Sequence, residues 1–515
     1  MLRTTLALSA LAVALTAACG HDAPGTSVGV SLAYDDGLQL EIADVTLTNR
    51  TESGPIAHQL LLLVPDDLAG TEMPIEVWAR RAGKRTAYGA TSAVPLLGKT
   101  VQAQLSLTAC TPGCSGAMLT TCTGPVKACT LGCSDVGDAH CIGPRPSNGV
   151  DPAAVAGLSG TTTITGDTTF DTGTGEITGA LSRAPGTGID AGIGYVQSAG
   201  VGGGAPLGIF VFHNLTVEVA ALVRFTGPRA VVFLVGDTAK IDGQLEPSAG
   251  QGMPSNPGPG GGAGGTAGAP AGGCGPGGAG SRGAAVGSVD DSGGGGGGGG
   301  AAGGAGGVSR TTNGGAAGIA CLPATLEPLQ GGSGGGRSSP GATAGARGGG
   351  GGGALQLTAL GSLEINGIIH AGGAGGESGL LDPLDASSGG GGGGGGAILL
   401  EAPSVVIGGS ALVAANGGGG GGGGGTGALA NGGNATPSLT PAVGAAGFSV
   451  GTSGGAGDVA GRAAVSGSGS SGTLGAANGG GGGGAVGAIV IRGRAVTLNG
   501  LITPTASKLD VQIGQ

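Results

Sequence analysis

Charged and aromatic side chains are scarce in this sequence. Only 10% of its 515 residues are charged, and it holds one Trp, three Tyr and six Phe. The formal net charge of −10 and the lack of long basic stretches exclude the electrostatic track that nucleic-acid binding needs. So few aromatic residues also disfavour most ligand pockets. The one basic cluster, RRAGKR at Arg80–Arg85, is interpreted as a turn between two strands.

Glycine and proline, in contrast, are abundant. The chain has 129 Gly and 27 Pro, about 30% together, a share that usually indicates disorder. The low charge and a mean hydropathy of +0.28 oppose that interpretation, because disordered chains are normally charged and hydrophilic. Apolar material is therefore expected to form a core.

The N-terminus predicts export. Arg3 precedes an apolar run, Leu6–Leu15, and small residues lead to Cys19. This pattern is typical of a secretory signal and is too short for a membrane-spanning helix. It resembles the lipobox of bacterial lipoproteins, which implies cleavage before Cys19 and lipid attachment to its sulfur. Ordinary signal cleavage is the alternative. We expect the lipid to be the only membrane anchor.

Eight further cysteines are disulfide candidates. They are Cys110, Cys114, Cys122, Cys129, Cys133, Cys141, Cys274 and Cys321. The first six form a tandem repeat, in which ACTPGCSGAMLTTCTGP from Ala109 recurs as ACTLGCSDVGDAHCIGP from Ala128. Modules this small cannot bury a sufficient core, so disulfides replace it. A zinc site is the alternative, disfavoured by the cysteine spacing and the oxidising compartment. The connectivity stays open.

Residues 26–108 predict a small antiparallel β-sandwich. Apolar residues alternate in several short runs, for example at Ile75, Val77 and Ala79, and turn residues separate these runs. We assign Trp78 to the core of this domain.

One strand-rich cassette recurs four times in the glycine-rich region. The copies begin at Ala230, Ala354, Ala397 and Ala488, and a partial copy begins at Ile209. Each copy predicts three short strands, with a corner glycine before the third. These glycines are Gly243, Gly367, Gly409 and Gly500. Three short strands per repeat with glycine corners predict the stacked rungs of a parallel β-helix.

Polyglycine runs separate the cassettes and are interpreted as loops extruded from the coil. One alternative is a flexible coil. The other is extended helices of the polyproline type packed side by side, since only glycine permits such close approach of backbones. We favour partly ordered extrusions.

No catalytic constellation and no metal site is predicted, and no cofactor is expected. The five histidines lack metal-ligand spacing. Glu364, Glu401 and Arg492 are interpreted as occupying different cassette positions, so they would not gather on one face of the coil, as a polysaccharide lyase or hydrolase requires.

The combination resembles a class of predicted surface lipoproteins of myxobacteria. These carry a lipobox, a Cys-rich repeat of the CxxGCS type that ends in a PSNG-like stretch, and a glycine-rich β-helical passenger. Here the matching residues are CTLGCS and PSNG, within Cys129–Gly149. The GGAGG segments at Gly261, Gly303 and Gly372 are also similar in composition to mycobacterial PE-PGRS surface proteins. The resemblance implies a location more than an activity.

These observations together predict an all-β chain with five parts. They are a signal peptide (1–18), a lipidated linker (19–25), a β-sandwich (26–108), a duplicated Cys-rich module (109–145) and a glycine-rich β-helix domain (146–515). The function we expect is that of a non-enzymatic, exported lipoprotein of the outer membrane or cell surface, adhesin-like or structural, with extracellular polysaccharide or other surface proteins as possible partners. The alternatives are a β-helical carbohydrate-active enzyme and a polysaccharide-binding module without turnover.

Overall fold

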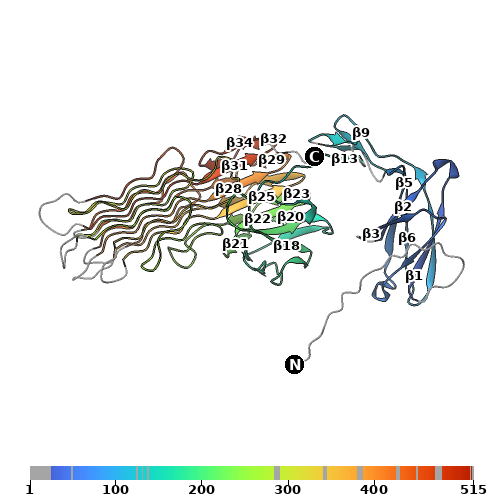
Figure 1. The fold of residues 1–515 in the computed structure, drawn as a ribbon, viewed down its shortest axis with the longest axis horizontal. Helices are drawn as coiled ribbons and strands as arrows, with labels where there is room; N and C mark the ends of the chain where they lie inside the picture. Colours follow the sequence, from blue (N-terminus) through green and yellow to red (C-terminus); the bar gives the residue numbers. More distant parts are fainter. Residues whose placement is uncertain are drawn as a thin grey trace, which may run out of the picture. The chain divides into compact units, whose positions relative to one another are not determined.

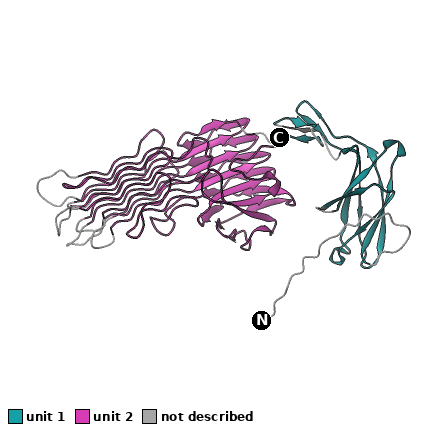
Figure 2. Ribbon diagram, viewed as in Figure 1, with its two compact units in different colours: residues 1–142, 515 teal, residues 143–514 magenta. Residues whose placement is uncertain are grey.

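The computed structural model describes residues 25–47, 50–122, 126–129, 131–135, 139–282, 290–339, 345–379, 387–424, 430–447, 451–469, 478–510 and 512. Within them the prediction of an all-β chain is confirmed. The helices are short 3-10 turns, η1 (Asp36–Leu38), η2 (Asp66–Leu68) and η3 (Pro152–Val155). The chain divides into two compact units, residues 1–142 with 515 and residues 143–514 (Figure 2). The signal peptide and Cys19 lie outside the described residues.

Two sheets in the first unit surround one apolar core. The first has the strand order β4-β1-β7 and the second the order β3-β2-β5-β6-β8. Their bounds are β1 (Ser27–Ala33), β2 (Ile42–Leu47), β3 (Arg50–Pro55), β4 (Gln59–Leu63), β5 (Met73–Arg81), β6 (Lys84–Ala93), β7 (Thr100–Ser106) and β8 (Thr108–Ala109). Side chains from both sheets meet in the core, among them Val28 and Val77.

The first unit departs from the sequence predictions in two respects. Its smaller sheet is mixed rather than antiparallel, because β1 pairs antiparallel with β4 but parallel with β7. The prediction that Trp78 is a core residue is wrong. Val77 and Ala79 are fully buried, and the two-residue period of a strand turns Trp78 to the opposite, outer face, where it is only partly buried.

The Cys-rich module folds as two short sheets within the first unit. Their strands are β9 (Gly113–Ser115), β10 (Met118–Thr120), β11 (Lys127–Ala128), β12 (Cys133–Ser134) and β13 (His140–Cys141). The expectation of disulfide bonding is confirmed. Each repeat closes its own loop, through Cys110–Cys122 and Cys129–Cys141, and Cys114–Cys133 joins the equivalent positions of the two repeats. This pairing leaves none of these thiolates for a zinc ion.

Three largely parallel sheets build the second unit (Figure 1). The first contains β14 (Thr161–Ile164), β20 (Asn214–Val217), β23 (Thr238–Ile241), β26 (Ser362–Ile365), β29 (Ser404–Ile407) and β32 (Ala495–Leu498). The second contains β16 (Ile177–Gly179), β15 (Thr168–Asp171), β21 (Leu222–Thr226), β24 (Gln244–Glu246), β27 (Ile368–His370), β30 (Leu412–Ala414) and β33 (Leu501–Thr503). The third contains β17 (Gly188–Asp190), β18 (Ile193–Ser198), β19 (Leu207–Phe212), β22 (Ala230–Val235), β25 (Ala354–Ala359), β28 (Ala397–Glu401), β31 (Ala488–Arg492) and β34 (Ser507–Leu509).

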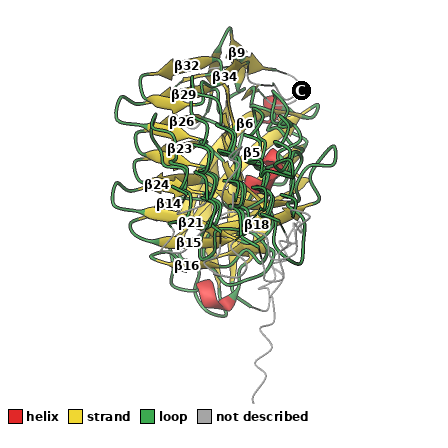
Figure 3. Ribbon diagram, turned by 90° about the vertical axis from the view of Figure 1, so that its left-hand side faces the viewer, coloured by secondary structure: helices red, strands yellow, loops and turns green. Residues whose placement is uncertain are grey.

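Consecutive strands visit these sheets in a constant order. β22 lies in the third sheet, β23 in the first and β24 in the second, and β25–β27, β28–β30 and β31–β33 repeat the cycle. These are the four cassettes read from the sequence. Equivalent residues pair directly, with Ala354 opposite Ala397 and Ala397 opposite Ala488. Segments far apart along the chain are therefore neighbours in the stack, and Figure 3 shows β32, β29, β26 and β23 one above the other.

One predicted corner lies elsewhere. A Cβ at Gly367 would stand 1.9 Å from the carbonyl oxygen of Gly243, so consecutive corners stack too closely for a side chain. At the next turn the corner is longer, and Gly408 is the residue that lies against Asn366. A Cβ at Gly409 would meet nothing within 4 Å, so the assignment of Gly409 to the equivalent position is wrong.

Aliphatic and aromatic side chains fill the interior of the stack. Alternate residues of the third sheet, such as Val231 and Phe233, point inward and are fully buried. The aromatic residues gather in the first turns, where Phe170, Phe210, Phe212, Phe225, Phe233 and Tyr195 pack on one another. β22 and β25 are buried along their whole length, because segment 150–158 and residues 326–329 cover the outer face of the third sheet. A sheet covered on both faces explains the continuous apolar sequence of β22 and the burial of the polar residues Gln356 and Thr358 in β25.

The glycine runs leave the stack after β24, β27 and β30 and form a lattice of extended segments, visible as parallel traces in Figure 1. Run 293–298 shows its hydrogen bonding. The amides and their acceptors are Gly293 to Gly307, Gly294 to Gly389, Gly295 to Gly278, Gly296 to Gly304, Gly297 to Gly392 and Gly298 to Gly275, all at 2.8–2.9 Å. Every third residue returns to the same neighbour, as three residues per turn require.

The carbonyl groups of the same run bond to three other neighbours. They accept from the amides of Gly315, Gly482, Gly336, Gly318, Ala485 and Ser333, in sequence order, at 2.7–3.0 Å. The run is buried, and each of its peptide groups donates once and accepts once. Of the two alternatives read from the sequence, the packed polyproline-type helices describe this run.

Only glycine fits this spacing. A Cβ at Gly393 would lie 1.9 Å from the carbonyl oxygen of Gly350, and one at Gly295 would lie 1.9 Å from that of Ala316. No side chain can give way, because the obstructing atoms belong to the backbone of the neighbouring segment.

We expect Gly393→Ala to destabilise the second unit by about 2–3 kcal/mol, because it overpacks the lattice. The matched control is Gly409→Ala, whose Cβ enters open space, and we expect it to change stability by less than about 0.5 kcal/mol. Urea unfolding followed by far-UV circular dichroism measures both. Equal midpoints for the two variants would contradict the lattice.

Candidate functional site

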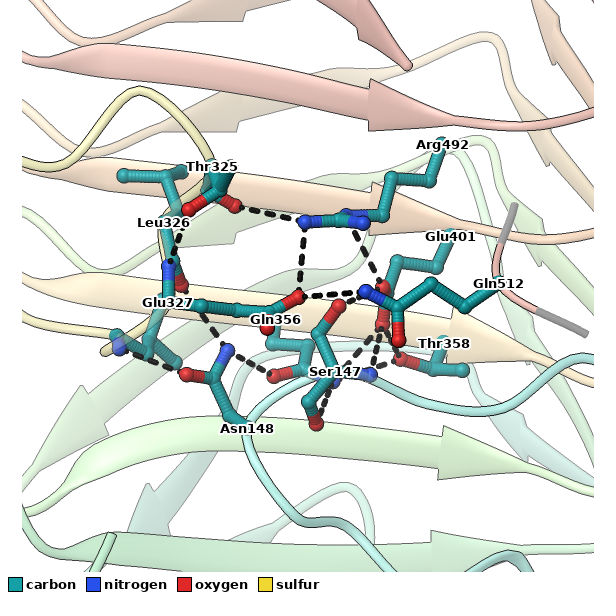
Figure 4. A network of polar contacts seen from close by, with 11 residues as sticks. Ser147, Asn148, Thr325, Leu326, Glu327, Gln356, Thr358, Glu401, Arg492 and Gln512 are labelled. Atoms are coloured by element: carbon teal, nitrogen blue, oxygen red, sulfur yellow. Dashed lines mark hydrogen bonds and ion pairs between the residues drawn. The ribbon is translucent and has the colours of Figure 1, made fainter. Parts of the chain in front are cut away.

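A network of buried polar side chains lies on the outer face of the third sheet, beneath the segment that covers it (Figure 4). Side chains on the outer face of a sheet usually contact solvent, but on this sheet the covering segments bury them. The sheet contributes Gln356, Thr358, Glu401 and Arg492, and the covering segments contribute Ser147, Asn148 and Glu327. Of all the described polar clusters, this one joins the most distant parts of the sequence.

Glu401 is the centre of the network and is 2% exposed. Its carboxylate accepts from the hydroxyl and the amide of Ser147, the latter at 3.2 Å. It also accepts from Gln356 Nε2 at 2.9 Å and Thr358 Oγ1 at 2.8 Å. Burial raises the pKa of Glu401, and the bonds from Ser147 and Thr358 act in the opposite direction. Donors from the protein thus occupy both oxygens.

Arg492 supplies the positive charge. Its Nε lies 3.7 Å from Glu401 Oε1, and one terminal nitrogen lies 2.8 Å from Glu327 Oε1. The same nitrogen donates to the carbonyl of Thr325 at 3.3 Å. Gln512, close to the end of the chain, donates to Glu327 at 3.3 Å. The guanidinium therefore connects β31, the covering loop and the C-terminal segment.

The three charged residues Glu364, Glu401 and Arg492 do not all share one cassette position, but the sequence interpretation missed that Glu401 and Arg492 do. Thr358, Glu401 and Arg492 are direct cross-strand partners in one column of the third sheet. The signal was in the sequence, since AILLE and AIVIR both begin at the cassette alanine and end in the charged residue. Glu364 belongs to β26, in another sheet.

Asn148 fixes the covering segment. Its backbone has a φ of +58°, a left-handed conformation that Asn tolerates better than most residues. Its amide group donates to Gln356 Oε1 at 3.0 Å and to the Leu326 carbonyl at 3.1 Å, and it accepts from the Leu329 amide at 2.8 Å. The PSNG stretch is thus the element that attaches the covering segment to the sheet.

The chemistry available to this network is structural. A general acid must reach a substrate oxygen, but Ser147, Gln356 and Thr358 enclose the Glu401 carboxylate. The arrangement clamps together the start, the middle and the end of the second unit.

The cysteines read as disulfide candidates are all paired. Cys274 and Cys321 form the fourth bond, which joins two extended segments of the lattice, 271–282 and 312–321. The lipid-attachment residue Cys19 is not among the described residues. In the described part of the chain no group of three or more His, Cys, Asp and Glu side chains could hold a metal ion. None of the described helices is long and apolar enough to cross a membrane.

Two titratable side chains that sequence reasoning did not select line small cavities in the second unit. His370 lines one of ≈ 300 Å³ together with Glu246, Gln251 and Asn434. Asp458 lines the other, of ≈ 410 Å³, next to Arg462. Both side chains follow short strands or glycine segments, and nothing in the sequence distinguishes them from surface residues.

The contact with Ser248 determines which ring nitrogen of His370 carries the hydrogen. The Ser248 hydroxyl donates to the His370 carbonyl at 2.7 Å, so at 3.0 Å from His370 Nδ1 it can only accept. His370 is therefore a neutral ring protonated on Nδ1. Its Nε2 is buried and has no hydrogen-bond partner among the described residues. Burial lowers the pKa of His370 to about 4. Burial also raises the pKa of Asp458, to about 6.

The chain matches no known protein family, and no curated protein and no solved structure is detectably similar to it.

The clamp predicts a large effect of Glu401→Ala. Removing the carboxylate takes away one of the two carboxylates beside the buried Arg492, which keeps only Glu327. It also removes the buried acceptor shared by Ser147, Gln356 and Thr358. We expect a loss of about 3–5 kcal/mol in the free energy of unfolding. Glu218→Ala, at an exposed corner of the same unit, is the control and should stay within about 0.5 kcal/mol of the parent. A Glu401→Ala variant as stable as the control would contradict the clamp.

His370 predicts a pH dependence. Because its pKa is lowered on folding, the unfolded chain binds a proton below pH 6.5 that the folded chain rejects until about pH 4. Stability is therefore lost as the pH falls through this window, by about 3 kcal/mol. Asp458 acts with the opposite sign, since its raised pKa favours the folded, protonated form as the pH falls from about 6.

Comparison of His370→Asn with the parent isolates the histidine from Asp458. The variant should lose less stability between pH 6.5 and 4 than the parent, measured as urea midpoints at each pH. His213→Asn keeps His370 and should behave like the parent. Parallel pH profiles for His370→Asn and the parent would refute the assignment.

Proposed function

We propose that this chain is an exported, lipid-anchored surface protein without enzymatic activity, which acts as a scaffold in an adhesin-like or structural role. The sequence supports export and anchoring through the predicted leader and Cys19. The disulfides of the Cys-rich module agree with an oxidising compartment.

The glycine lattice is the observation that carries this proposal. It uses a large part of the chain to build a hydrogen-bonded body whose described buried surface is mostly backbone, which suits a supporting role. Described residues that flank separate connecting segments meet at one end of it. The Ser292 amide donates to the Ser281 carbonyl, the Ser388 hydroxyl to the Ser292 carbonyl at 2.6 Å, and Asn478 Nδ2 to the Gly424 carbonyl at 3.3 Å.

The three-sheet stack is, in this proposal, a parallel β-helix. Its support is the constant order in which β22–β24, β25–β27, β28–β30 and β31–β33 visit the three sheets. The glycine segments then leave at the same corner of successive turns. A coil of this kind anchors each segment at both ends, because the strands before and after it are already paired.

We expect Cys19→Ser to release the protein from membranes. The parent chain should fractionate with membranes and carry an acylated N-terminal cysteine detectable by mass spectrometry. The Cys19→Ser variant should appear in the soluble exported fraction. A Cys274→Ser/Cys321→Ser variant, which keeps Cys19, is the control and should stay with the membranes.

Protease treatment of intact cells tests exposure at the surface. Degradation of the parent chain on intact cells supports the surface location. A Cys19 without lipid in the parent chain, or membrane association of the Cys19→Ser variant equal to that of the parent, overturns the anchoring.

A further inference from the structure

The outer face of the five-stranded sheet in the first unit carries a continuous row of polar and aromatic side chains. Direct cross-strand pairing aligns one residue from each strand, in the order Ser53, Asp44, Trp78, Tyr88 and Thr108. Cross-strand partners share a face of a sheet. This row therefore crosses the whole width of the sheet on the side opposite the core.

Trp78 and Tyr88 form the centre of the row. Their ring centroids are 4.7 Å apart with an interplanar angle of 49°. The guanidinium carbon of Arg85 lies 4.9 Å from the centroid of the Trp78 ring. Both residues are partly buried, so part of each side chain remains in contact with solvent. Trp78 is the only Trp of the chain, and the described Phe side chains are buried in the second unit.

Buried charge holds this arrangement in place. Asp44, whose side chain is 5% exposed, accepts from Arg80 Nε at 2.6 Å and from the Ser53 hydroxyl at 2.7 Å. Arg85 Nε lies 3.9 Å from the same carboxylate. Both guanidinium groups are thereby tied to Asp44, and that of Arg85 is held over the Trp78 ring.

The only basic cluster of the sequence lies beside the middle of this row, at the turn between β5 and β6. Arg80, Arg81, Lys84 and Arg85 supply four of the 21 Lys and Arg residues, from a single hairpin. Arg81 and Lys84 are cross-strand partners and are exposed to solvent. Glu41 accepts from the Ala82 amide at 3.1 Å, and with Asp44 it neutralises part of this charge. A local positive excess remains in a chain whose net charge is −10.

We propose that this face binds a carboxylated polysaccharide, a chain of uronic-acid residues. Sugar rings present C–H groups that pack against aromatic surfaces, here the solvent-exposed parts of Trp78 and Tyr88. The exposed cations Arg81 and Lys84 pair with the carboxylates, and guanidinium groups are well suited to this partner. Hydroxyl groups at Ser53 and Thr108 provide hydrogen bonds to sugar hydroxyls at the two ends of the row.

The charge and the row together favour this ligand over other polyanions. Glu76, which is exposed on the same face of β5, adds a third carboxylate to Asp44 and Glu41. Four cations beside three carboxylates are too few for the phosphate track of a nucleic acid, which depends on many neutralised charges. A linear acidic peptide uses the cations but has no use for an aromatic row between hydroxyl groups. The inference names a partner for the proposed surface protein, but it requires neither the lipid anchor nor surface exposure, so each can fail without the other.

Intrinsic fluorescence tests the proposal directly, because a chain with a single Trp reports only on Trp78. The full chain, purified in detergent, is titrated with polygalacturonate and alginate. We expect a saturable change in intensity or emission maximum that weakens as salt is added, and no change with neutral dextran. The absence of any saturable change with either uronate polymer overturns the proposal.

Variants separate the aromatic contribution from the charge. Affinity electrophoresis in gels that contain polygalacturonate measures binding without relying on Trp fluorescence. We expect Trp78→Ala to weaken binding at least tenfold and Arg81→Ala/Lys84→Ala at least fivefold. The matched control is Arg310→Ala/Arg462→Ala, which removes two exposed cations from the second unit and should bind like the parent.

Two outcomes identify simple electrostatic attraction and contradict the proposal. One is equal retardation by double-stranded DNA or polyglutamate that does not respond to Trp78→Ala. The other is an equal loss of binding in the control double variant. Trp78→Phe serves as a second variant in case Trp78→Ala perturbs the sheet. It keeps an aromatic ring, and its affinity for polygalacturonate should lie between that of the parent and that of Arg81→Ala/Lys84→Ala.

Discussion

The close approach of peptide backbones is the constraint on which the second unit depends. Within run 293–298 every amide and every carbonyl has a partner on another segment. Ordering glycine costs more conformational entropy than ordering any other residue. The complete hydrogen bonding of a buried run offsets that cost, and an unpaired buried peptide group would add to it. The spacing that allows these bonds leaves no room for a Cβ, so the structure of the lattice requires the glycine-rich composition.

The stacked strands and the lattice support each other. The cassettes bury aliphatic side chains inside the stack, and their register places successive glycine segments at the same corner. The lattice in turn links segments that belong to different turns, as when Gly297 donates to Gly392. The third sheet is covered a second time by the segment that contains Ser147 and Asn148. Its few buried polar groups, centred on Glu401 and Arg492, secure that cover.

In the two proposals, recognition and support fall to different parts of the chain. Buried polar side chains of the second unit bind to one another, as the enclosed Glu401 carboxylate illustrates. The first unit keeps Trp78, Tyr88 and the exposed hairpin cations on an outer sheet face. A scaffold with a separate recognition face agrees with the surface role that we propose.

The sequence by itself determined the elements whose causes are local. The cassette at Ala397 could be read from alternation. The number and spacing of the six clustered cysteines predicted that they form disulfides, but not which cysteine bonds to which. Tertiary structure decided what depends on residues far apart. It brought Glu401 beside Arg492, turned Trp78 outward, and chose the carbonyl that faces Gly393. Alternation reports which side chains share a face, whereas register and burial arise only when distant strands pack, and that packing decides which face meets the core.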